Sequence, residues 1–270
     1  MPPFSHTMTT DPSPSYELTT STRYDLQLLG LGWNTAVNDD IPSAYMLLPY
    51  HLARLREAAQ QHGWTKCLAV LNEEALEAVC DTAVESAIKL YPGKPFRVRI
   101  TLSHDGQLLA TAFPIDPFPT TDPLKPEDGS MHLVHLDTIP TQPSIFTSTK
   151  TTHREHYDSA RARANLQPLA TPEGRSIDVI LYTPAGHLSE TSIRNLALKR
   201  NNQWWTPNAR SAGCLPGIMR RVLLEQGYWT EVGEGDLHKD HLVDGEIVMT
   251  ANAVEGCRLA RVIIHNHPST

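Results

Sequence analysis

The segment from Asp178 to Arg221 constrains this chain more than any other, because it places a carboxylate and a glycine-led helix start in one short stretch. Glu190 follows a glycine turn and precedes a strand-like pattern. Further on, the sequence Gly213-Cys-Leu-Pro-Gly-Ile-Met-Arg220 predicts a turn that opens a helix, since proline suits a first helical turn and glycine lets backbone approach an anion. Lys150 lies upstream of the segment. An amine, a carboxylate and a helix N-terminus can therefore meet in one site.

These three features are what pyridoxal phosphate requires of a protein. Its aldehyde needs an amine to form an imine, and lysine is the side chain that offers one. Its pyridine nitrogen needs an acid, and its phosphate suits the free amides and positive dipole end of a helix N-terminus. Lys150, Glu190 and the amides near Ile218 and Met219 fit these roles. Taken singly, such residues are common on surfaces and in turns, so the residues alone leave the cofactor open.

Several motifs occur in the order that is typical of one enzyme family. The chain resembles the class IV aminotransferases, the fold-type IV pyridoxal-phosphate enzymes, from Tyr16 onward. That family includes branched-chain and D-amino-acid aminotransferases, (R)-selective amine transaminases and aminodeoxychorismate lyase. The matching pieces are Tyr16 through Arg23, His51-Leu-Ala-Arg54-Leu55, Gly186-His-Leu-Ser-Glu190, Asn195, Thr206-Pro207 and Gly213 through Arg220.

The resemblance implies an α+β fold with a small α/β N-terminal lobe, a larger mixed α/β barrel-like C-terminal lobe and the cofactor between them. It implies that Lys150 carries the cofactor imine and then moves protons. Glu190 would pair with the pyridine nitrogen. Arg54 would bind the phosphate together with the backbone of Ile218 and Met219.

Two further cofactor contacts are implied less directly. A threonine or asparagine near the last strands meets the phosphate in this family, and here Asn252 is the better match and Thr250 the alternative. Arg154 stands where many relatives have a polar residue near the ring. Branched-chain aminotransferases carry a tyrosine five residues after the lysine, whereas this chain has Glu155.

The details of the motifs resemble aminodeoxychorismate lyase, and the run from Lys150 to Tyr157 resembles its fungal branch. The expected reaction therefore forms an external aldimine with an amine substrate and converts 4-amino-4-deoxychorismate to 4-aminobenzoate and pyruvate. An (R)-selective amine or D-amino-acid transaminase is the alternative, and a catalytically silent relative that binds the cofactor is the second. Arginines suit anionic substrates, and the candidates are Arg23, Arg97 and Arg99 on first-lobe strands.

Composition excludes other classes of function. The formal net charge of −7 disfavours a nucleic-acid surface, and no apolar run is long enough to span a bilayer. The pair His238 and His241 lacks an obvious third ligand, so no metal site is expected. The four scattered cysteines favour reduced thiols and a cytoplasmic location. Family resemblance implies a homodimer that acts on a small-molecule amine.

Pattern along the chain predicts a disordered leader over residues 1–14, a small domain over 15–119, a proline-rich linker over 120–130 and a large domain over 131–270. Arg161 and Arg163 are expected on a solvated helix face. Helices are predicted at 49–62, 72–90, 153–165 and 216–226. Strands are predicted at 16–28, 96–102, 107–113, 132–136, 177–181, 193–198, 228–232, 246–250 and 259–265.

Overall fold

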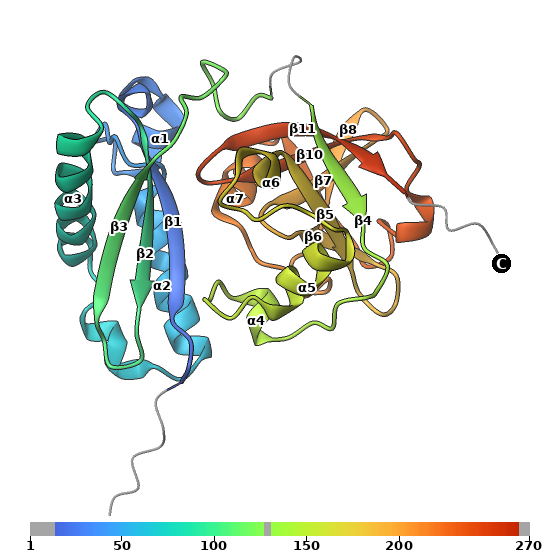
Figure 1. The fold of residues 1–270 in the computed structure, drawn as a ribbon, viewed down its shortest axis with the longest axis horizontal. Coiled ribbons are helices and arrows are strands. Elements are labelled where there is room, and N and C mark those ends of the chain that lie inside the picture. Colours follow the sequence, from blue (N-terminus) through green and yellow to red (C-terminus); the bar gives the residue numbers. More distant parts are fainter. Residues whose placement is uncertain (1–13, 127–130, 265–270) are drawn as a thin grey trace, which may run out of the picture.

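The computed structural model describes residues 14–126 and 131–264, and these form two lobes built on separate sheets (Figure 1). The predicted leader, the end of the predicted linker and the last residue of the final predicted strand lie outside the described residues, apart from residue 14. The predicted α+β class and two-lobe architecture are confirmed.

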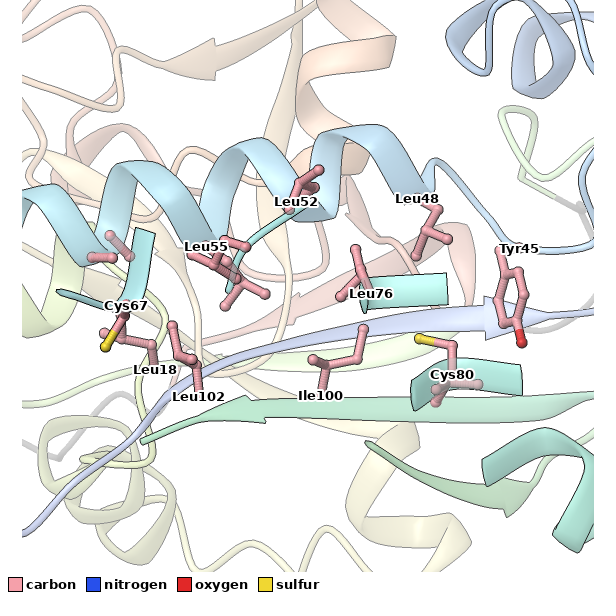
Figure 2. Packing of buried hydrophobic residues seen from close by; sticks show 14 of the residues in the cluster. Leu18, Tyr45, Leu48, Leu52, Leu55, Cys67, Leu76, Cys80, Ile100 and Leu102 are labelled. Carbon is pink, nitrogen blue, oxygen red and sulfur yellow. The ribbon is translucent and has the colours of Figure 1, made fainter. Parts of the chain in front are cut away.

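The small lobe is a three-stranded antiparallel sheet with helices on one face. Its strands are β1 (Leu18–Tyr24), β2 (Phe96–Leu102) and β3 (Leu108–Pro114), in that order, and α2 (Leu48–Gln61) and α3 (Glu73–Leu90) cover them. Strand β2 alternates strictly, so Phe96, Val98, Ile100 and Leu102 are buried while Arg97 and Arg99 point to the opposite face. Figure 2 shows the resulting core between sheet and helices.

Helix α3 begins directly after Asn72, the residue at which the sequence predicts its start. The Asn72 side chain accepts a hydrogen bond from the amide of Ala75, and Glu73 and Glu74 occupy the first turn, where the helix dipole favours negative charge. Its buried residues, Leu76, Cys80, Val84 and Ala87, recur at helical spacing.

The large lobe is a curled eight-stranded mixed sheet in the order β6-β5-β4-β11-β10-β7-β8-β9. The pairs β4–β5, β4–β11 and β8–β9 are parallel and the others are antiparallel. The strands are β4 (His132–Leu136), β5 (Ile177–Tyr182), β6 (Leu188–Thr191), β7 (Asn195–Arg200), β8 (Gln203–Pro207), β9 (Trp229–Val232), β10 (Ile247–Asn252) and β11 (Gly256–Ile263). The curl brings β6 close to β7 and β8 as well as to β5.

Helix α7 (Ile218–Glu225) joins the two lobes through a shared core. Its Ile218 and Met219 pack in one buried cluster with Met46 and Leu47, which precede α2 in the small lobe. Phe118 belongs to the same cluster, so the proline-rich stretch before residue 120 is packed against the protein.

The segment that carries Lys150 also bridges the lobes, because it pairs with the start of β1. The amide of Thr19 donates to the carbonyl of Lys150 at 2.9 Å, and the amide of Thr152 donates to the carbonyl of Glu17 at 2.9 Å. Thr151 forms an isolated antiparallel bridge with Leu18. The small lobe therefore fixes the backbone on both sides of the lysine.

The structure corrects several predicted elements. Strand β1 ends at Tyr24 instead of residue 28, because the Asp25 side chain caps a 3-10 helix, Leu26–Gly30. Strands β6 and β8 were not predicted, since both are short and β6 is buried without alternation. The helices α1 (Gly32–Val37), α4 (Ile145–Ser148) and α6 (Pro172–Ser176) were not predicted either. Helix α5 runs Glu155–Arg163, two residues shorter at each end than predicted.

Among the described residues, no helix combines the length and apolarity that a transmembrane span requires.

Removing side-chain volume from the small-lobe core should destabilise it. Ile100 is fully buried between β2 and the helices, so Ile100→Ala should cost about 2–5 kcal/mol of the free energy of unfolding. Urea denaturation followed by circular dichroism measures this. The matched control is Leu90→Ala at the end of α3, where the side chain is 73% exposed. Equal losses for the two variants would contradict the assigned core.

Candidate active site between the lobes

A cavity of about 320 Å³ lies between the two lobes. The small lobe contributes β1, β2 and α2 to its lining, and the large lobe contributes the Lys150 segment, the β6–β7 turn, the start of α7 and the β10–β11 turn. Of the sequence-predicted site residues, the cavity brings together Arg54, Arg97, Arg99, Lys150, Arg154, Glu190, Ile218, Met219 and Asn252.

Lys150 lies in the cavity wall in a strongly positive environment. Burial lowers its pKa to about 7, and the charges of Arg54 and Arg154 act in the same direction, whereas Glu190 opposes them. At neutral pH a large fraction of this amine is therefore unprotonated and able to act as a nucleophile or base.

Glu190 is buried in the cavity wall, where its carboxylate accepts hydrogen bonds from three donors. The Tyr157 hydroxyl donates to Oε1 at 2.6 Å, and the amide of Leu215 donates to the same oxygen at 3.2 Å. Oε2 receives only a long contact of 3.5 Å from the Asn195 side chain. Burial raises the Glu190 pKa to about 7, while these hydrogen bonds and Lys150 oppose that rise. Oε2 thus keeps capacity for a further donor from the cavity.

Arg54 and the start of α7 form a positive corner of the cavity. Arg54 donates to the Thr20 hydroxyl, but its buried Nε has no hydrogen-bond partner among the described residues. Ile218 and Met219 are the first two residues of α7, whose amides have no acceptor within the helix. A buried guanidinium with a free Nε donor beside free helix amides is an anion-binding arrangement.

Gly217 lets the chain approach this corner closely. A Cβ at this position would lie 1.8 Å from Oδ1 of Asn195. Asn195 is buried, and its Nδ2 donates to the carbonyl of Leu215 at 2.8 Å, which orients the loop before α7. Only glycine therefore fits between β7 and the helix start.

The comparisons with known proteins agree with this geometry. Residues 37–263 match the sequence profile of the family described as amino-transferase class IV. The chain belongs to the class IV aminotransferases. A Schizosaccharomyces pombe protein named "Putative aminodeoxychorismate lyase" is 32% identical over 77% of this chain and 80% of its own length.

Two other similar proteins extend the comparison. The Saccharomyces cerevisiae protein named "Aminodeoxychorismate lyase" is 34% identical over 46% of this chain and 35% of its own length. The crystal structure of a "Putative amino-acid aminotransferase" from Mesorhizobium loti has a TM-score of 0.63 at 20% identity, covering 92% of this chain and all of that one. This last likeness shows the shared fold.

Class IV aminotransferases depend on pyridoxal 5'-phosphate, and the cavity fits that cofactor. The partnerless Nε of Arg54 and the α7 amides suit its phosphate, and the open Oε2 of Glu190 suits a protonated ring nitrogen. The amine of Lys150 lies in the same cavity wall. The donor set thus matches the three chemical demands of the cofactor.

Arg154 and Asn252 also line the cavity, but both have structural partners. Arg154 donates to the carbonyl of Ser192 at 2.9 Å, and its guanidinium lies 4.8 Å from the centre of the Tyr157 ring. The Asn252 Oδ1 accepts from the amides of Val254 and Glu255 at 2.9 and 2.8 Å, which closes the β10–β11 turn. Asn252 therefore shapes the loop that faces the cavity.

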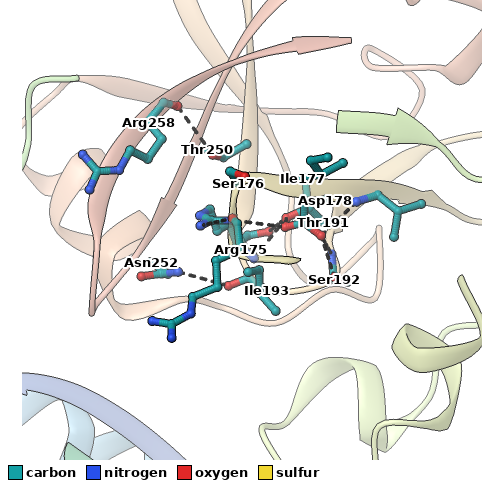
Figure 3. A network of polar contacts seen from close by, with 12 residues as sticks. Arg175, Ser176, Ile177, Asp178, Thr191, Ser192, Ile193, Thr250, Asn252 and Arg258 are labelled. Atoms are coloured by element: carbon teal, nitrogen blue, oxygen red, sulfur yellow. Dashed lines mark hydrogen bonds and ion pairs between the residues drawn. The ribbon is translucent and has the colours of Figure 1, made fainter. Parts of the chain in front are cut away.

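Arg23 and Thr250 are not among the residues that line the cavity. Arg23 is 2% exposed, since it forms an ion pair of 2.7 Å with Asp25 and stacks 3.7 Å from the centre of the Phe118 ring. Thr250 is buried within β10, with its hydroxyl 3.5 Å from the carbonyl of Arg258 (Figure 3). The structure therefore does not support the predicted substrate contact of Arg23, whose guanidinium binds Asp25 and stacks on Phe118. It does not support the predicted cofactor contact of Thr250 either, because that side chain is buried within the sheet.

Arg161 and Arg163 were expected on a solvated face, which is wrong for Arg161, whereas Arg163 is exposed. Arg161 is buried and lies 3.6 Å from Asp178, and Arg163 forms an ion pair of 2.6 Å with the buried Asp137. Helix α5 lies against β5, so these guanidiniums reach Asp178 within β5 and Asp137 directly after β4. Helical spacing alone could not reveal partners so distant in the sequence.

Sequence reasoning also missed residues that the cavity brings in. The hydroxyl of Tyr157, seven residues after the lysine, donates a hydrogen bond to Glu190, a contact that the sequence analysis did not predict. Arg175 from α6 lines the cavity as well. The signal for Tyr157 was present in the Lys150–Tyr157 run, but nothing in the sequence placed Arg175 there.

Modification of the apo-protein should reveal the lowered pKa of Lys150. Because its amine loses the proton near pH 7, reductive methylation of Lys150 should rise with pH and level off above about 7. Ordinary exposed lysines should keep gaining reactivity towards about pH 10.4. Mass spectrometry of peptides after short labelling measures both profiles. A Lys150 profile that follows the exposed lysines would contradict the assigned environment.

A methyl group at Gly217 should weaken cofactor binding. In Gly217→Ala the new Cβ must displace Asn195 or the start of α7, so the affinity for pyridoxal phosphate should fall about tenfold or more, the loss expected for a disturbed charged hydrogen bond. Equilibrium dialysis with absorbance detection measures this. The control is Gly32→Ala, where a Cβ meets nothing within 4 Å. Unchanged affinity in Gly217→Ala would contradict the assignment of the α7 amides to the cofactor phosphate.

Proposed function

We propose that this protein is a 4-amino-4-deoxychorismate lyase that releases 4-aminobenzoate and pyruvate. The observation that carries the proposal is the cavity between the lobes, where Lys150 and Glu190 lie together with arginines suited to an anionic substrate. The names of the two fungal relatives support the same reaction.

When bound, pyridoxal phosphate supplies an aldehyde that reacts with amines and a ring that delocalises negative charge. Arg54 and the amides of Ile218 and Met219 hold the phosphate in this proposal. Glu190 would keep a proton on the ring nitrogen, because its buried carboxylate lines the cavity and its Oε2 has only a 3.5 Å contact within the protein. The hydrogen bonds to its Oε1 fix the direction of the carboxylate.

Lys150 is the catalytic residue of the proposal. Its Nζ, with a pKa near 7, removes the proton from the amine-bearing carbon of the substrate and returns it later in the reaction. Arg54 and Arg154 help to keep this amine unprotonated through their positive charge. Arg154, which stacks on Tyr157, would lie near the cofactor ring, and Asn252 would shape the loop near the cofactor phosphate.

Arg97 and Arg99 are the proposed substrate contacts. Both project from the same face of β2 into the cavity lining. A carboxylate can bind two such guanidiniums through charge-assisted hydrogen bonds.

A transaminase of (R)-amines or D-amino acids is the second candidate. The fold shared with an amino-acid aminotransferase favours it, since the same lysine and carboxylate serve both reactions. The two outcomes differ in what leaves the substrate after the first proton transfer. A catalytically silent role is disfavoured, because Lys150 and Glu190 both lie in the cavity.

We also propose that two copies of the chain associate. The outer face of the small sheet leaves Leu109 and Phe113 48% and 53% exposed on β3, and a second copy would cover such apolar side chains. A cytoplasmic location is proposed because all four cysteines are buried free thiols, a state that reducing compartments maintain.

Removal of the Lys150 amine should abolish the reaction. Lys150→Ala should form neither 4-aminobenzoate nor pyruvate from enzymatically generated 4-amino-4-deoxychorismate, because no other side chain at that position can move the proton. Fluorescence of 4-aminobenzoate and a coupled pyruvate assay measure both products. The exposed Lys89→Ala is the control and should keep wild-type rates.

Two outcomes would redirect the assignment. If the wild type forms neither product but converts its cofactor to the amine form with D-alanine or (R)-1-phenylethylamine, the protein is a transaminase. A wild type that keeps no cofactor absorbance after incubation with pyridoxal phosphate and removal of the excess would overturn cofactor binding altogether.

A further inference from the structure

Three arginines on the cavity lining have no carboxylate of their own. Arg97 and Arg99 come from β2, and Arg175 comes from α6 in the other lobe. Among the described residues, none of the three forms an ion pair. Other arginines of the lining do: Arg194 pairs with Glu255 and lies 3.4 Å from Asp178. The unpaired guanidiniums are therefore available to an anionic ligand.

The backbone of Arg175 is fixed by a buried polar network. Its carbonyl accepts a hydrogen bond of 2.9 Å from Arg194, whose guanidinium is held by Asp178 and Glu255. Gly174 packs so closely on Pro168 that a Cβ would lie 2.0 Å from the Pro168 carbonyl oxygen. This turn cannot shift easily, so the backbone position of Arg175 is fixed.

The side chain of Arg175 extends away from that network, as Figure 3 shows. Its Nε donates to the carbonyl of Leu169 at 3.2 Å, which directs the plane of the guanidinium. No acceptor for its two terminal nitrogens lies within hydrogen-bond distance among the described residues. Arginine binds carboxylates through such forked donors.

The charge of the cavity favours anions beyond the cofactor. Its lining contains seven cationic side chains, Arg54, Arg97, Arg99, Lys150, Arg154, Arg175 and Arg194, but only two acidic ones, Glu190 and Glu255. The whole chain, by contrast, has a net charge of −7. Burial lowers the pKa of Arg97, and the like charges of Arg99 and Arg175 lower it further. Such crowding of like charges is relieved when anions bind.

The proposed reaction supplies two carboxylates. Each product, 4-aminobenzoate and pyruvate, carries one, so their common precursor carries both. Arg97 and Arg99 share one strand face of the small lobe, whereas Arg175 belongs to the large lobe. Two separate groups of guanidiniums thus face one dianionic substrate.

We infer that Arg175 is a specificity-determining residue that binds one carboxylate of a dicarboxylate substrate while Arg97 and Arg99 bind the other. This inference rests on the proposed lyase function. It assigns the selection of dianionic over monoanionic amines to a residue of α6, and it requires both lobes to contact each substrate molecule.

Binding of unreactive probes to the cofactor-loaded protein tests the inference. Chorismate carries both carboxylates but a hydroxyl in place of the amine, so it binds without reacting. Isothermal titration should show about tenfold or greater weakening of chorismate in Arg175→Gln, the loss of one charge-assisted hydrogen bond. Arg175→Lys, which keeps the charge, should recover part of the affinity. Arg210→Gln, an exposed arginine outside the cavity, is the control and should bind like the wild type.

The two products separate the two groups of arginines. Arg175→Gln should weaken either 4-aminobenzoate or pyruvate, and Arg97→Gln should weaken the other. Unchanged chorismate binding in Arg175→Gln, or equal weakening of both products, would overturn the inference. If the wild type forms no 4-aminobenzoate yet chorismate binding depends on Arg175, the proposed lyase function fails and the dicarboxylate site stands.

Discussion

The pairing of the Lys150 segment with β1 is the interaction on which the site depends. Two backbone hydrogen bonds join Glu17 and Thr19 to Thr152 and Lys150, so the large-lobe lysine is held by the small-lobe sheet. Arg54, on α2, packs behind the same strand and reaches Thr20. The buried cluster around α7 also joins the lobes, but this pairing is the contact that fixes the backbone of the lysine itself. Lys150, Arg54 and the arginines of β2 are therefore brought together at the interface between the lobes.

Enclosure between the lobes also sets the protonation states. In water an amine and a carboxylate like those of Lys150 and Glu190 would both be charged near neutral pH. Burial instead moves the pKa of each to about 7, from opposite sides. The arginines add to the effect on the lysine, whereas the Tyr157 hydroxyl and the Leu215 amide hold Glu190 back from full neutrality. The same enclosure thus produces a basic amine and a carboxylate that can share a proton with a ligand.

Sequence alone predicted the parts of this site that depend on local order. The position of Glu190 after its turn and the alternation of β2 are local patterns, and the structure has both. The helix predicted over 216–226 is also present, but it begins two residues later, at Ile218, with Gly217 as its N-cap. What the sequence could not supply was contact across distance. The pairing of Arg161 with Asp178 and the arrival of Arg175 at the cavity depend on how α5 and α6 pack on β5. The contacts of Arg23 with Asp25 and Phe118 were not predicted either, and with these partners Arg23 does not line the cavity.

Because the cofactor-binding residues are shared across the family, the cavity residues outside the cofactor contacts must determine which reaction occurs. Lyases and transaminases need the same lysine, carboxylate and phosphate cradle, so these residues cannot distinguish them. A lyase must also hold a leaving group beside the reacting carbon, and here that group is an anion. Unpaired guanidiniums from both lobes could orient it, whereas monoanionic amines would leave part of this positive charge uncompensated. The proposed dicarboxylate site therefore assigns substrate specificity to arginines that do not bind the cofactor.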